Sequence, residues 1–448
     1  MAGMNVGLIS GMDTASLIGQ LMQVEANPQT LLKRKLAETQ NDAAAYREVN
    51  TKFDALRDAA ELLTRTTTWA AATASSSSTA VTVTAAPGAT AGSVSFGVTS
   101  LAAKHAVFSS DAPWAATTTA FGPTSLTLTP EDTATPATTI AIPAGATLGE
   151  AVTTINDAGA GVTAALVNTG SGYRLQLTST AAGAASEFAV TGLPTTVLTQ
   201  ASDAKLRVGT DAVGYDVTST TNTFKDLMPG VTLTVSQTGG PVTVGVASDP
   251  EAVATAVESL VAAANAVLTN IDKHTSTKTG SIAVLKGDST LRGLTGKVLE
   301  AVSYAIGGAS AAQAGIQLTR DGEITFTKAT FIAALESSPA LAQQLVNGTP
   351  AAGTDPAVPG VAQRLTELAK NATNFTSGTL TLKANSTDSL ASDLQDRIED
   401  WDRRLAIRES TLTRQFTAME TALSSLQNQS AWLSSQVSSL PSWSSSSD

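Results

Sequence analysis

The sequence predicts an α+β multidomain protein in which terminal coiled-coil helices and a helical domain flank two nested, mainly antiparallel β domains. Three observations lead to this prediction. Both ends of the chain repeat apolar residues at helical spacing, the middle alternates short Val- and Thr-rich segments with turn residues, and further helical patterns surround that middle. We expect a terminal leg domain of residues 1–40 and 415–448, a helical domain of 41–69 and 249–414, a β domain of 70–112 and 200–248, and an inserted β domain of 113–199.

Two helices are predicted at the start of the chain, at about 14–26 and 28–64. Asp13 is suited to cap the first helix, and Asn27-Pro28 places a proline where only the first turn of a second helix tolerates it. The apolar pattern is weak between residues 37 and 45. Its members are Leu17, Leu21, Val24, Leu31, Leu32, Leu36, Tyr46, Val49, Phe53, Leu56 and Leu63.

The C-terminal pattern predicts a long helix with a mean apolar period near 3.5 residues, which is typical of a coiled-coil seam. Arg408 interrupts the seam, and the two four-residue steps that follow it resemble a stutter. The apolar positions are Leu390, Leu394, Ile398, Trp401, Leu405, Leu412, Phe416, Met419, Leu423, Leu426, Leu433, Val437 and Leu440.

Between the ends, alternating segments predict ten strands and one short helix at 148–157. Residues 66–79 are interpreted as a connector, because their Thr, Ser and Ala residues carry no clear apolar period. The strands are expected at 81–83, 94–98, 106–108, 126–128, 140–142, 175–177, 206–208, 214–217, 231–235 and 242–246.

After the strands, helical patterns return. Asp249-Pro250 begins one helix and Asp288 caps another, because aspartate favours the N-cap and proline the first turn. Asp321-Gly322 predicts a tight turn between strands at 316–318 and 324–326. Short helices at 328–336 and 339–346 precede a Gly- and Pro-rich loop at 348–360, and the helical pattern resumes at Val361.

Composition excludes several classes of function. A formal net charge of −11 leaves no basic field that would attract phosphate, so we expect no nucleic-acid partner. No run approaches the 18 apolar residues of a membrane helix, so no membrane span is expected. The N-terminus lacks the basic region and apolar core of a cleavable signal peptide, so an exported protein would use another route.

The sequence offers no assembled catalytic, cofactor or metal site, and we expect the protein not to be an enzyme. It has two histidines and no cysteine, which rules out a Cys/His dyad or a histidine-rich zinc site within one chain. His105 is expected to be an ordinary residue at a strand edge, because no Gly-x-Ser-x-Gly elbow accompanies it. The segment 293–297 resembles the end of a phosphate-binding loop, but Val298 stands where Ser or Thr is required and the segment fits an amphipathic helix.

The terminal helices bury too few large apolar side chains to offset the conformational entropy of ordering them alone. We therefore expect both ends to be largely disordered in the monomer and to fold on docking to a partner. Proteolysis should then spare a core of about 65–390. The alternative is an antiparallel coiled coil within one chain that forms unaided.

Four motifs in order resemble one family. The segment from Gly7 to Thr14, followed by Pro28, resembles the opening signature of flagellar filament-capping proteins, also called hook-associated protein 2 or the FliD family. Residues 148–177 are similar to the Ile-Asn module that flagellins and hook-associated proteins share, and residues 226–233 and 285–292 resemble internal blocks of the family. The matching signature residues are Gly7, Leu8, Ser10, Gly11, Asp13 and Pro28.

The resemblance implies a homo-oligomeric ring at the distal tip of the bacterial flagellum, with flagellin folding beneath a plate of β domains. It implies extracellular location after export by the flagellar type III apparatus with a chaperone and without a cleaved signal peptide. Flagellin and the hook-associated junction proteins would be partners. The residues expected to dock onto the filament or to form the oligomer are Leu17, Leu21, Val24, Leu31, Leu412, Phe416, Met419, Leu423, Leu426, Leu433 and Val437.

Two other interpretations remain open at this point. A hook–filament junction protein or minor flagellin would share the terminal helices and the Ile-Asn module, but the opening from Gly7 to Asp13 disfavours it. A flagellar-tip adhesin would use the exposed Thr-rich β modules to bind surface glycans.

Overall fold

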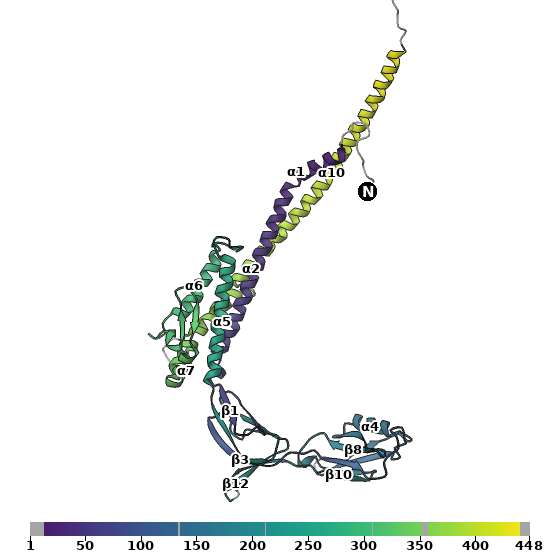
Figure 1. Ribbon diagram of the computed structural model, residues 1–448, viewed down its shortest axis with the longest axis vertical. Helices are drawn as coiled ribbons and strands as arrows, with labels where there is room; N and C mark the ends of the chain where they lie inside the picture. The colour runs from purple at the N-terminus through teal and green to yellow at the C-terminus, as the bar shows by residue number, and fades with distance from the viewer. Residues whose placement is uncertain (1–12, 133–134, 211, 307, 352–356, 440–448) are drawn as a thin grey trace, which may run out of the picture. The chain divides into compact units, whose positions relative to one another are not determined.

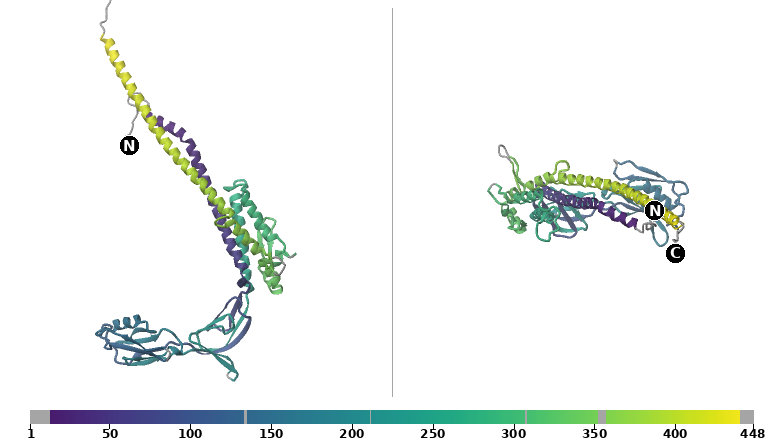
Figure 2. Two further views of the ribbon diagram at one scale, coloured as in Figure 1. Left: turned by 180° about the vertical axis from the view of Figure 1, so that it is seen from behind. Right: turned by 90° about the horizontal axis from the view of Figure 1, so that it is seen from above.

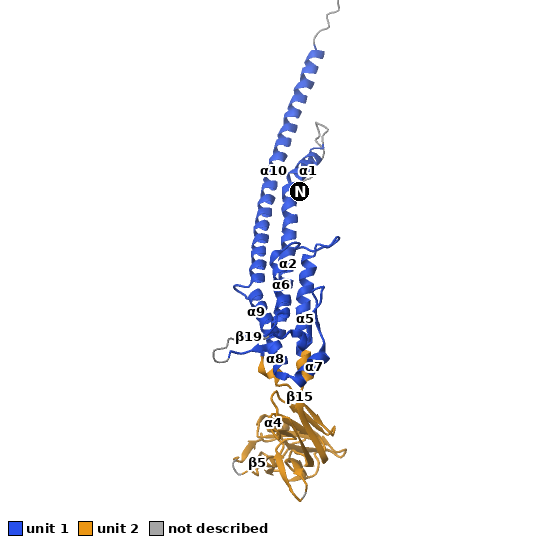
Figure 3. Ribbon diagram, turned by 90° about the vertical axis from the view of Figure 1, so that its left-hand side faces the viewer, with its two compact units in different colours: residues 1–64, 256–448 blue, residues 65–255 orange. Residues whose placement is uncertain are grey.

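The computed structural model describes residues 13–132, 135–210, 212–306, 308–351 and 357–439. The chain divides into two compact units, which are coloured separately in Figure 3. The helical unit comprises residues 1–64 and 256–448, and the β unit comprises residues 65–255. Most helices lie in the helical unit and most strands, in antiparallel sheets, lie in the β unit (Figure 1), which confirms the predicted α+β class.

The helical unit contains the predicted helices. The first, α1, begins after Asp13, whose carboxylate accepts a hydrogen bond of 2.9 Å from the backbone of Ser16. Asp288 caps α6 through the backbone of Leu291 in the same way. The helices are α1 (Thr14–Glu25), α2 (Asn27–Thr64), α5 (Pro250–Thr275), α6 (Ser289–Ser303), α7 (Lys328–Ser337), α8 (Pro339–Asn347), α9 (Val361–Thr373) and α10 (Thr379–Ser438).

Two short sheets complete this unit. The predicted hairpin is formed by β16 (Ile316–Leu318) and β17 (Ile324–Phe326), with Ile316 opposite Phe326. The Gly- and Pro-rich loop contains the two-residue strands β18 (Gly348–Thr349) and β19 (Val358–Pro359).

The second half of α2 lies at the centre of the helical core, where it packs against α9 and α10. Val49, Phe53, Leu56 and Leu63 are completely buried. The predicted boundary of the stable core at residue 65 is therefore wrong, because side chains before that residue fill the middle of the helical unit.

The first core of the β unit lies between a five-stranded sheet of order β1-β15-β3-β11-β12 and a three-stranded sheet of order β13-β14-β2. The strand pairs are antiparallel, with Val94 opposite Val244 and Leu233 opposite Val83. The strands are β1 (Ala72–Ser76), β2 (Val81–Ala85), β3 (Gly92–Ser100), β11 (Ala204–Gly209), β12 (Gly214–Ser219), β13 (Thr223–Lys225), β14 (Val231–Val235) and β15 (Gly239–Ser248).

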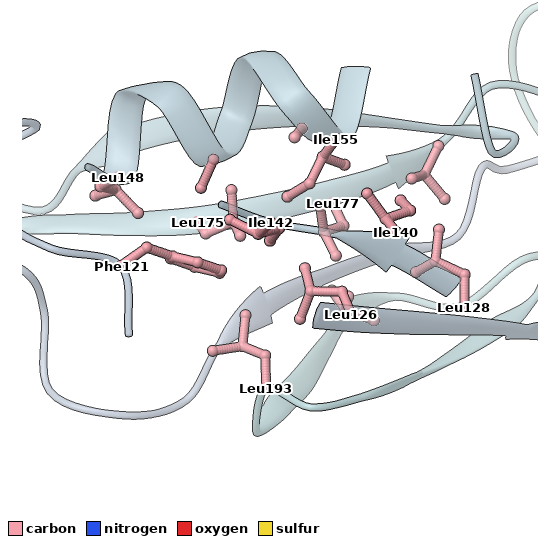
Figure 4. Close-up of a cluster of buried hydrophobic side chains, with 14 of the residues drawn as sticks. Phe121, Leu126, Leu128, Ile140, Ile142, Leu148, Ile155, Leu175, Leu177 and Leu193 are labelled. Atoms are coloured by element: carbon pink, nitrogen blue, oxygen red, sulfur yellow. The ribbon is translucent and has the colours of Figure 1, made fainter. Parts of the chain in front are cut away.

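The second core of the β unit lies beneath α4 (Leu148–Asp157), whose Leu148 and Ile155 are completely buried (Figure 4). Two antiparallel sheets, of order β10-β4-β8-β7 and β6-β5-β9, supply most of its other side chains, and connecting segments add Phe121, Ile142, Ala146 and Leu193. The strands are β4 (Ala106–Ser109), β5 (Ser125–Pro130), β6 (Thr138–Ala141), β7 (Val162–Asn168), β8 (Tyr173–Ser179), β9 (Phe188–Thr191) and β10 (Thr195–Thr199).

Some local predictions for the β unit are wrong or incomplete. The expected connector at 66–79 contains a short helix, α3 (Thr66–Trp69), and strand β1, which pairs with β15. Strands β7, β9, β10 and β13 were not predicted. Strand β4 pairs with β8 and β10, so Val107 belongs to the second core although the expected domain division assigns it to the first.

Among the described residues, one helix, α5, is long and apolar enough to cross a membrane by length and composition. The core helix of a globular protein meets the same criterion. The apolar side chains Val257, Leu260 and Ile271 of α5 are buried within the helical unit.

Candidate docking surface on the terminal helices

The terminal helices pair within the chain. Helix α1 and the first part of α2 run beside α10 in the views of Figure 1 and Figure 2. The pair is antiparallel, because Glu25 contacts Arg408 whereas the later residue Arg47 contacts the earlier Asp388. This is the arrangement of the intramolecular coiled coil that the sequence left as an alternative.

The inner face of this helix pair carries a mixed seam. Ile18 and Gln29 are each 6% exposed, and Leu394, Ile398 and Leu412 of α10 are similarly buried. On the α1–α2 side the seam positions follow one another at steps of three or four residues, which keeps them on one helical face. They are Ile18, Met22, Glu25, Gln29, Leu32, Leu36 and Thr39.

Polar contacts cross the same seam. The side-chain amide of Gln29 donates to Asp402 and, at 3.5 Å, to the backbone carbonyl of Ile398. Arg408 Nε donates to Glu25 Oε1 at 2.8 Å, so the residue that interrupts the apolar pattern of α10 forms an ion pair with α1. Nearer the helical core, Arg47 Nη2 donates to both carboxylate oxygens of Asp388.

The four predicted docking residues of α1 and α2 lie outside this seam. Leu17, Leu21, Val24 and Leu31 are between 41% and 67% exposed. They form the N-terminal stripe, an apolar row on a solvent-facing side of α1 and α2. The seam positions are instead the neighbouring residues Ile18 and Leu32, which are more buried, and the expected docking role of the four stripe residues stays a prediction.

The predicted residues of α10 divide by depth. Leu412 is buried and Phe416, Met419 and Leu423 are half-buried, whereas Leu426, Leu433 and Val437 are about 60% exposed. These last three form the C-terminal stripe, because steps of seven and four residues keep them on one face of α10. It lies on the part of α10 that continues beyond α1 (Figure 1 and Figure 3).

Two of the six signature residues fall within the described chain. Asp13 caps α1, and Pro28 occupies the first turn of α2, where the missing N–H has no partner to lose. Gly7, Leu8, Ser10 and Gly11 lie outside the described residues, as does Leu440 of the predicted C-terminal seam.

Charged groups between α2 and α5 form one cluster around Glu48. Its carboxylate accepts hydrogen bonds from Lys273 at 2.8 Å, His274 at 2.9 Å and Asn270 at 2.6 Å. The bond from Lys273 contributes most to lowering the pKa of Glu48 to about 2, and the bonds from His274 and Asn270 add to it. The cluster therefore fixes α5 against α2.

The remaining residues singled out for chemistry are structural. Gly293 and Lys297 lie inside α6, so the segment is a helix and not a phosphate-binding loop. His105 is 1% exposed, and its ring packs edge-to-face on Phe188 with centroids 4.9 Å apart, so it is a core residue and not an edge residue. Within the described ranges, no group of three or more His, Cys, Asp or Glu residues is placed to hold a metal ion.

Comparison with known families decides the relationship. The family model described as the flagellar hook-associated protein 2 C-terminus matches residues 201–428, which is just over half of the chain. The chain belongs to the flagellar hook-associated protein 2 family. The N-terminal model of that family matches residues 10–105, and the flagellin hook IN motif matches residues 125–181 around α4.

Relatives of the hook-associated protein 2 family agree in sequence and fold. The lateral flagellar hook-associated protein 2 of Vibrio parahaemolyticus is 25% identical over 305 residues, covering 62% of this chain and 66% of that relative, slightly less than two thirds of its length. The crystal structure of the D1-D2-D3 domains of the Escherichia coli flagellar cap protein FliD is 24% identical, with a TM-score of 0.60. That match covers 77% of this chain and 99% of the other, and it shows a shared fold.

Proposed function

We propose that this chain is a structural cap at the distal tip of the bacterial flagellar filament. Copies of the chain form an oligomeric plate, and exported flagellin folds beneath that plate and is inserted into the growing filament. Membership of the hook-associated protein 2 family supports this proposal. The Escherichia coli protein that shares the fold is itself described as a flagellar cap protein.

The observation that carries the proposal is the exposure of the N-terminal and C-terminal stripes. An antiparallel helix pair that needed only itself would keep polar residues outside its seam, yet Leu17, Leu21 and Val24 face solvent. Leu433 is exposed on the part of α10 beyond the pair. Contiguous exposed apolar surface on a protein marks an interaction site. The stripes are therefore the surfaces on which the terminal helices dock onto neighbouring subunits.

The partners follow from the tip location. The stripes dock onto flagellin, or onto hook-associated junction proteins before the first flagellin arrives, and other surfaces of the chain form the homo-oligomeric ring. The protein reaches the extracellular tip through the flagellar type III apparatus, with an export chaperone. The outer parts of the terminal helices become rigid on docking, because the stripes gain burial only there.

The test uses the C-terminal stripe, because it lies on the part of α10 that continues beyond α1 and its residues are about 60% exposed. In the double variant Leu426→Asp with Leu433→Asp, the β unit and the helical core should fold normally, since both side chains are about 60% exposed. Filament growth should stop, and unpolymerised flagellin should accumulate in the medium.

The matched control places the same two charges on polar positions of the same helix, Asn428→Asp with Ser435→Asp, both of which are exposed. It should support normal filaments. Filaments of normal length in the stripe variant, with flagellin retained, would refute docking through this surface. Equal failure of both variants would show that added charge, not loss of the apolar stripe, is responsible.

A further inference from the structure

We infer that Asn222, Gly183 and Asp203 hold the two cores of the β unit together as one rigid body. Two chain segments connect these cores. Residues 101–105 run from β3 of the first core to β4 of the second, and residues 200–203 return from β10 to β11. We call this pair of segments the junction. Its rigidity determines whether the second core keeps a fixed position on the first or moves as a flexible appendage.

Pairing of the two segments does not by itself make the junction rigid. Ala103 and Ser202 exchange both backbone hydrogen bonds, at 2.9 Å and 3.3 Å, but they form a single isolated bridge. The Ser202 hydroxyl adds one bond of 2.9 Å to the carbonyl of Leu101. A two-stranded ribbon alone is at best marginally stable in water, so these bonds would leave the segments free to bend and twist. Rigidity therefore requires contacts from the cores themselves.

The first core holds the junction through Asn222. This residue lies between β12 and β13, and its backbone carbonyl accepts a hydrogen bond of 2.8 Å from Val235 of β14. Its side-chain amide accepts from the N–H of Ala102 at 2.7 Å and donates to the carbonyl of Ala102 at 3.3 Å. The amide therefore takes the place of a neighbouring strand for Ala102 and ties this residue to the first core.

The second core holds the junction through the segment between β8 and β9. The N–H of Gly183 donates to the carbonyl of Ala103 at 3.2 Å. The N–H of Ala184 donates to Asp203 Oδ1 at 2.8 Å. The second core therefore binds both segments of the junction, one through a backbone carbonyl and the other through a carboxylate.

The two cores also meet directly at Gly183. This glycine is buried with φ +100, and a Cβ there would lie 2.8 Å from Cβ of Thr220 and 2.9 Å from its Cα. Thr220 belongs to the same connection between β12 and β13 as Asn222. Glycine permits this close approach because it has no Cβ and tolerates positive φ. A side chain at position 183 would push the two cores apart.

These contacts restrain the residues at which the junction would bend. A hinge absorbs domain motion by changing φ and ψ at a few connecting residues. The N–H and C=O groups of Ala102 are both bound to Asn222. Those of Ala103 are both bound to Ser202, and Gly183 is a second donor to the carbonyl. A change of backbone dihedral at either alanine would therefore break several hydrogen bonds at once.

The rigidity of the junction matters for the plate. If copies of the chain form that plate, each second core keeps a fixed position on the first core of its own copy. This consequence rests on the proposed function, whereas the rigidity itself does not.

The experiment measures the distance between the two cores by spin labelling of the full-length protein. The chain contains no cysteine, so the exposed positions Thr153→Cys on α4 and Lys225→Cys on β13 can be labelled without background. Double electron–electron resonance should show one narrow distance distribution. Adding Asn222→Ala, which removes both bonds to Ala102, should broaden it. Adding Gly183→Ala should shift or split it, since the new methyl group does not fit beside Thr220.

The matched controls make the same two substitutions away from the junction. Asn168→Ala removes a turn amide whose Oδ1 accepts from the N–H of Gly170 at 2.8 Å. Gly170→Ala adds a methyl group that would meet no atom within 4 Å. Both controls should leave the narrow distribution unchanged. Hydrogen exchange of the β8 and β14 amides should stay slow in Asn222→Ala, which would show that both cores remain folded.

A broad distribution in the labelled parent protein would overturn the inference. An unchanged distribution in either Asn222→Ala or Gly183→Ala would do the same. Broadening together with lost protection of β14 would also count against it, because Asn222 would then support the first core and not the junction. Failure of filament growth in the C-terminal stripe variant bears on docking alone and leaves this readout unaffected.

Discussion

Asn156 and Ala164 are joined by two hydrogen bonds that cover the outer edge of a sheet. The side-chain amide of Asn156 donates to the carbonyl of Ala164 at 3.0 Å and accepts from its N–H at 2.7 Å. Ala164 lies in β7, the edge strand of the sheet β10-β4-β8-β7. Ile155, the neighbouring residue on α4, is completely buried, so the Ile-Asn pair anchors the helix to the core and to the strand edge at once.

Asn156→Ala should therefore destabilise the second core of the β unit by about 1–2 kcal/mol, because two hydrogen bonds are lost and the groups of Ala164 become water-exposed. Hydrogen exchange of the β7 and β8 amides would report the change. Asp157→Ala, at the adjacent exposed position, is the control for altered helix propensity and should have a smaller effect. Equal protection in the Asn156 variant and the parent protein would contradict this role.

The turn between β7 and β8 offers a matched pair of glycines. Gly172 has φ +141, and a Cβ there would lie 2.7 Å from the carbonyl oxygen of Trp114. Gly170 has φ +84, and a Cβ there would meet no atom within 4 Å. Gly172→Ala should be more destabilising than Gly170→Ala by at least about 1 kcal/mol, since only the first adds a clash to the backbone strain. Comparison of their urea midpoints would check this, and similar midpoints would contradict it.

The Glu48 cluster predicts a loss of stability in acid. The pKa of Glu48 is lowered from 4.5 to about 2, so the stabilisation is present above pH 4.5 and disappears as the pH falls towards 2. The carboxylate is 40% exposed, and screening by solvent reduces the contribution to about 1 kcal/mol. Urea unfolding between pH 2 and pH 6 should show this slope in the parent protein. Glu48→Gln should flatten it, and an unchanged slope in that variant would assign the effect to other groups.

Limited proteolysis separates the two states expected of the terminal helices. If the outer helices fold only on docking, protease should cut first in the C-terminal stripe of α10 and in α1. Cleavage should stop near Ala43 and Leu394, where buried side chains of the helical core begin. Resistance of α1 and of residues 426–438 in a dilute monomer would show instead that the antiparallel pair is stable unaided.

Much of the fold could be predicted because its signals are local. Asp13, Asp249 and Asp288 each precede a helix and accept a hydrogen bond from its first turn, so the sequence marks these boundaries directly. The strand β1 was missed because its Ala, Thr and Ser side chains give no apolar alternation, and only its pairing with β15 makes it a strand. The placement of β4 depends on β8 and β10, which are distant in sequence. The four expected domains stay a prediction.

The sequence predicted which apolar residues the terminal helices carry, but not which of them face α10 and which face solvent. Leu17-Ile18 and Leu31-Leu32 are apolar doublets that place a side chain on each of two helix faces. Helical periodicity does not say which face another helix covers, and the structure resolves this in favour of Ile18 and Leu32. The predicted patterns contain Leu32, Leu36, Leu394, Ile398 and Leu412 of the seam. They do not contain Glu25 and Gln29, because these polar residues interrupt the apolar spacing on the α1–α2 side.

The insertion of the β unit between α2 and α5 has a consequence for the order of folding. Residues 65–255 form a contiguous stretch that contains both of its own cores, whereas α2 packs against α9 and α10, more than 290 residues later in the chain. Contacts between such distant segments form slowly, because a long loop must close first. In a chain that emerges from a narrow channel with its N-terminus leading, the β unit would therefore fold first. Helix α2 could pack against α9 and α10 only when the last quarter of the polypeptide had emerged.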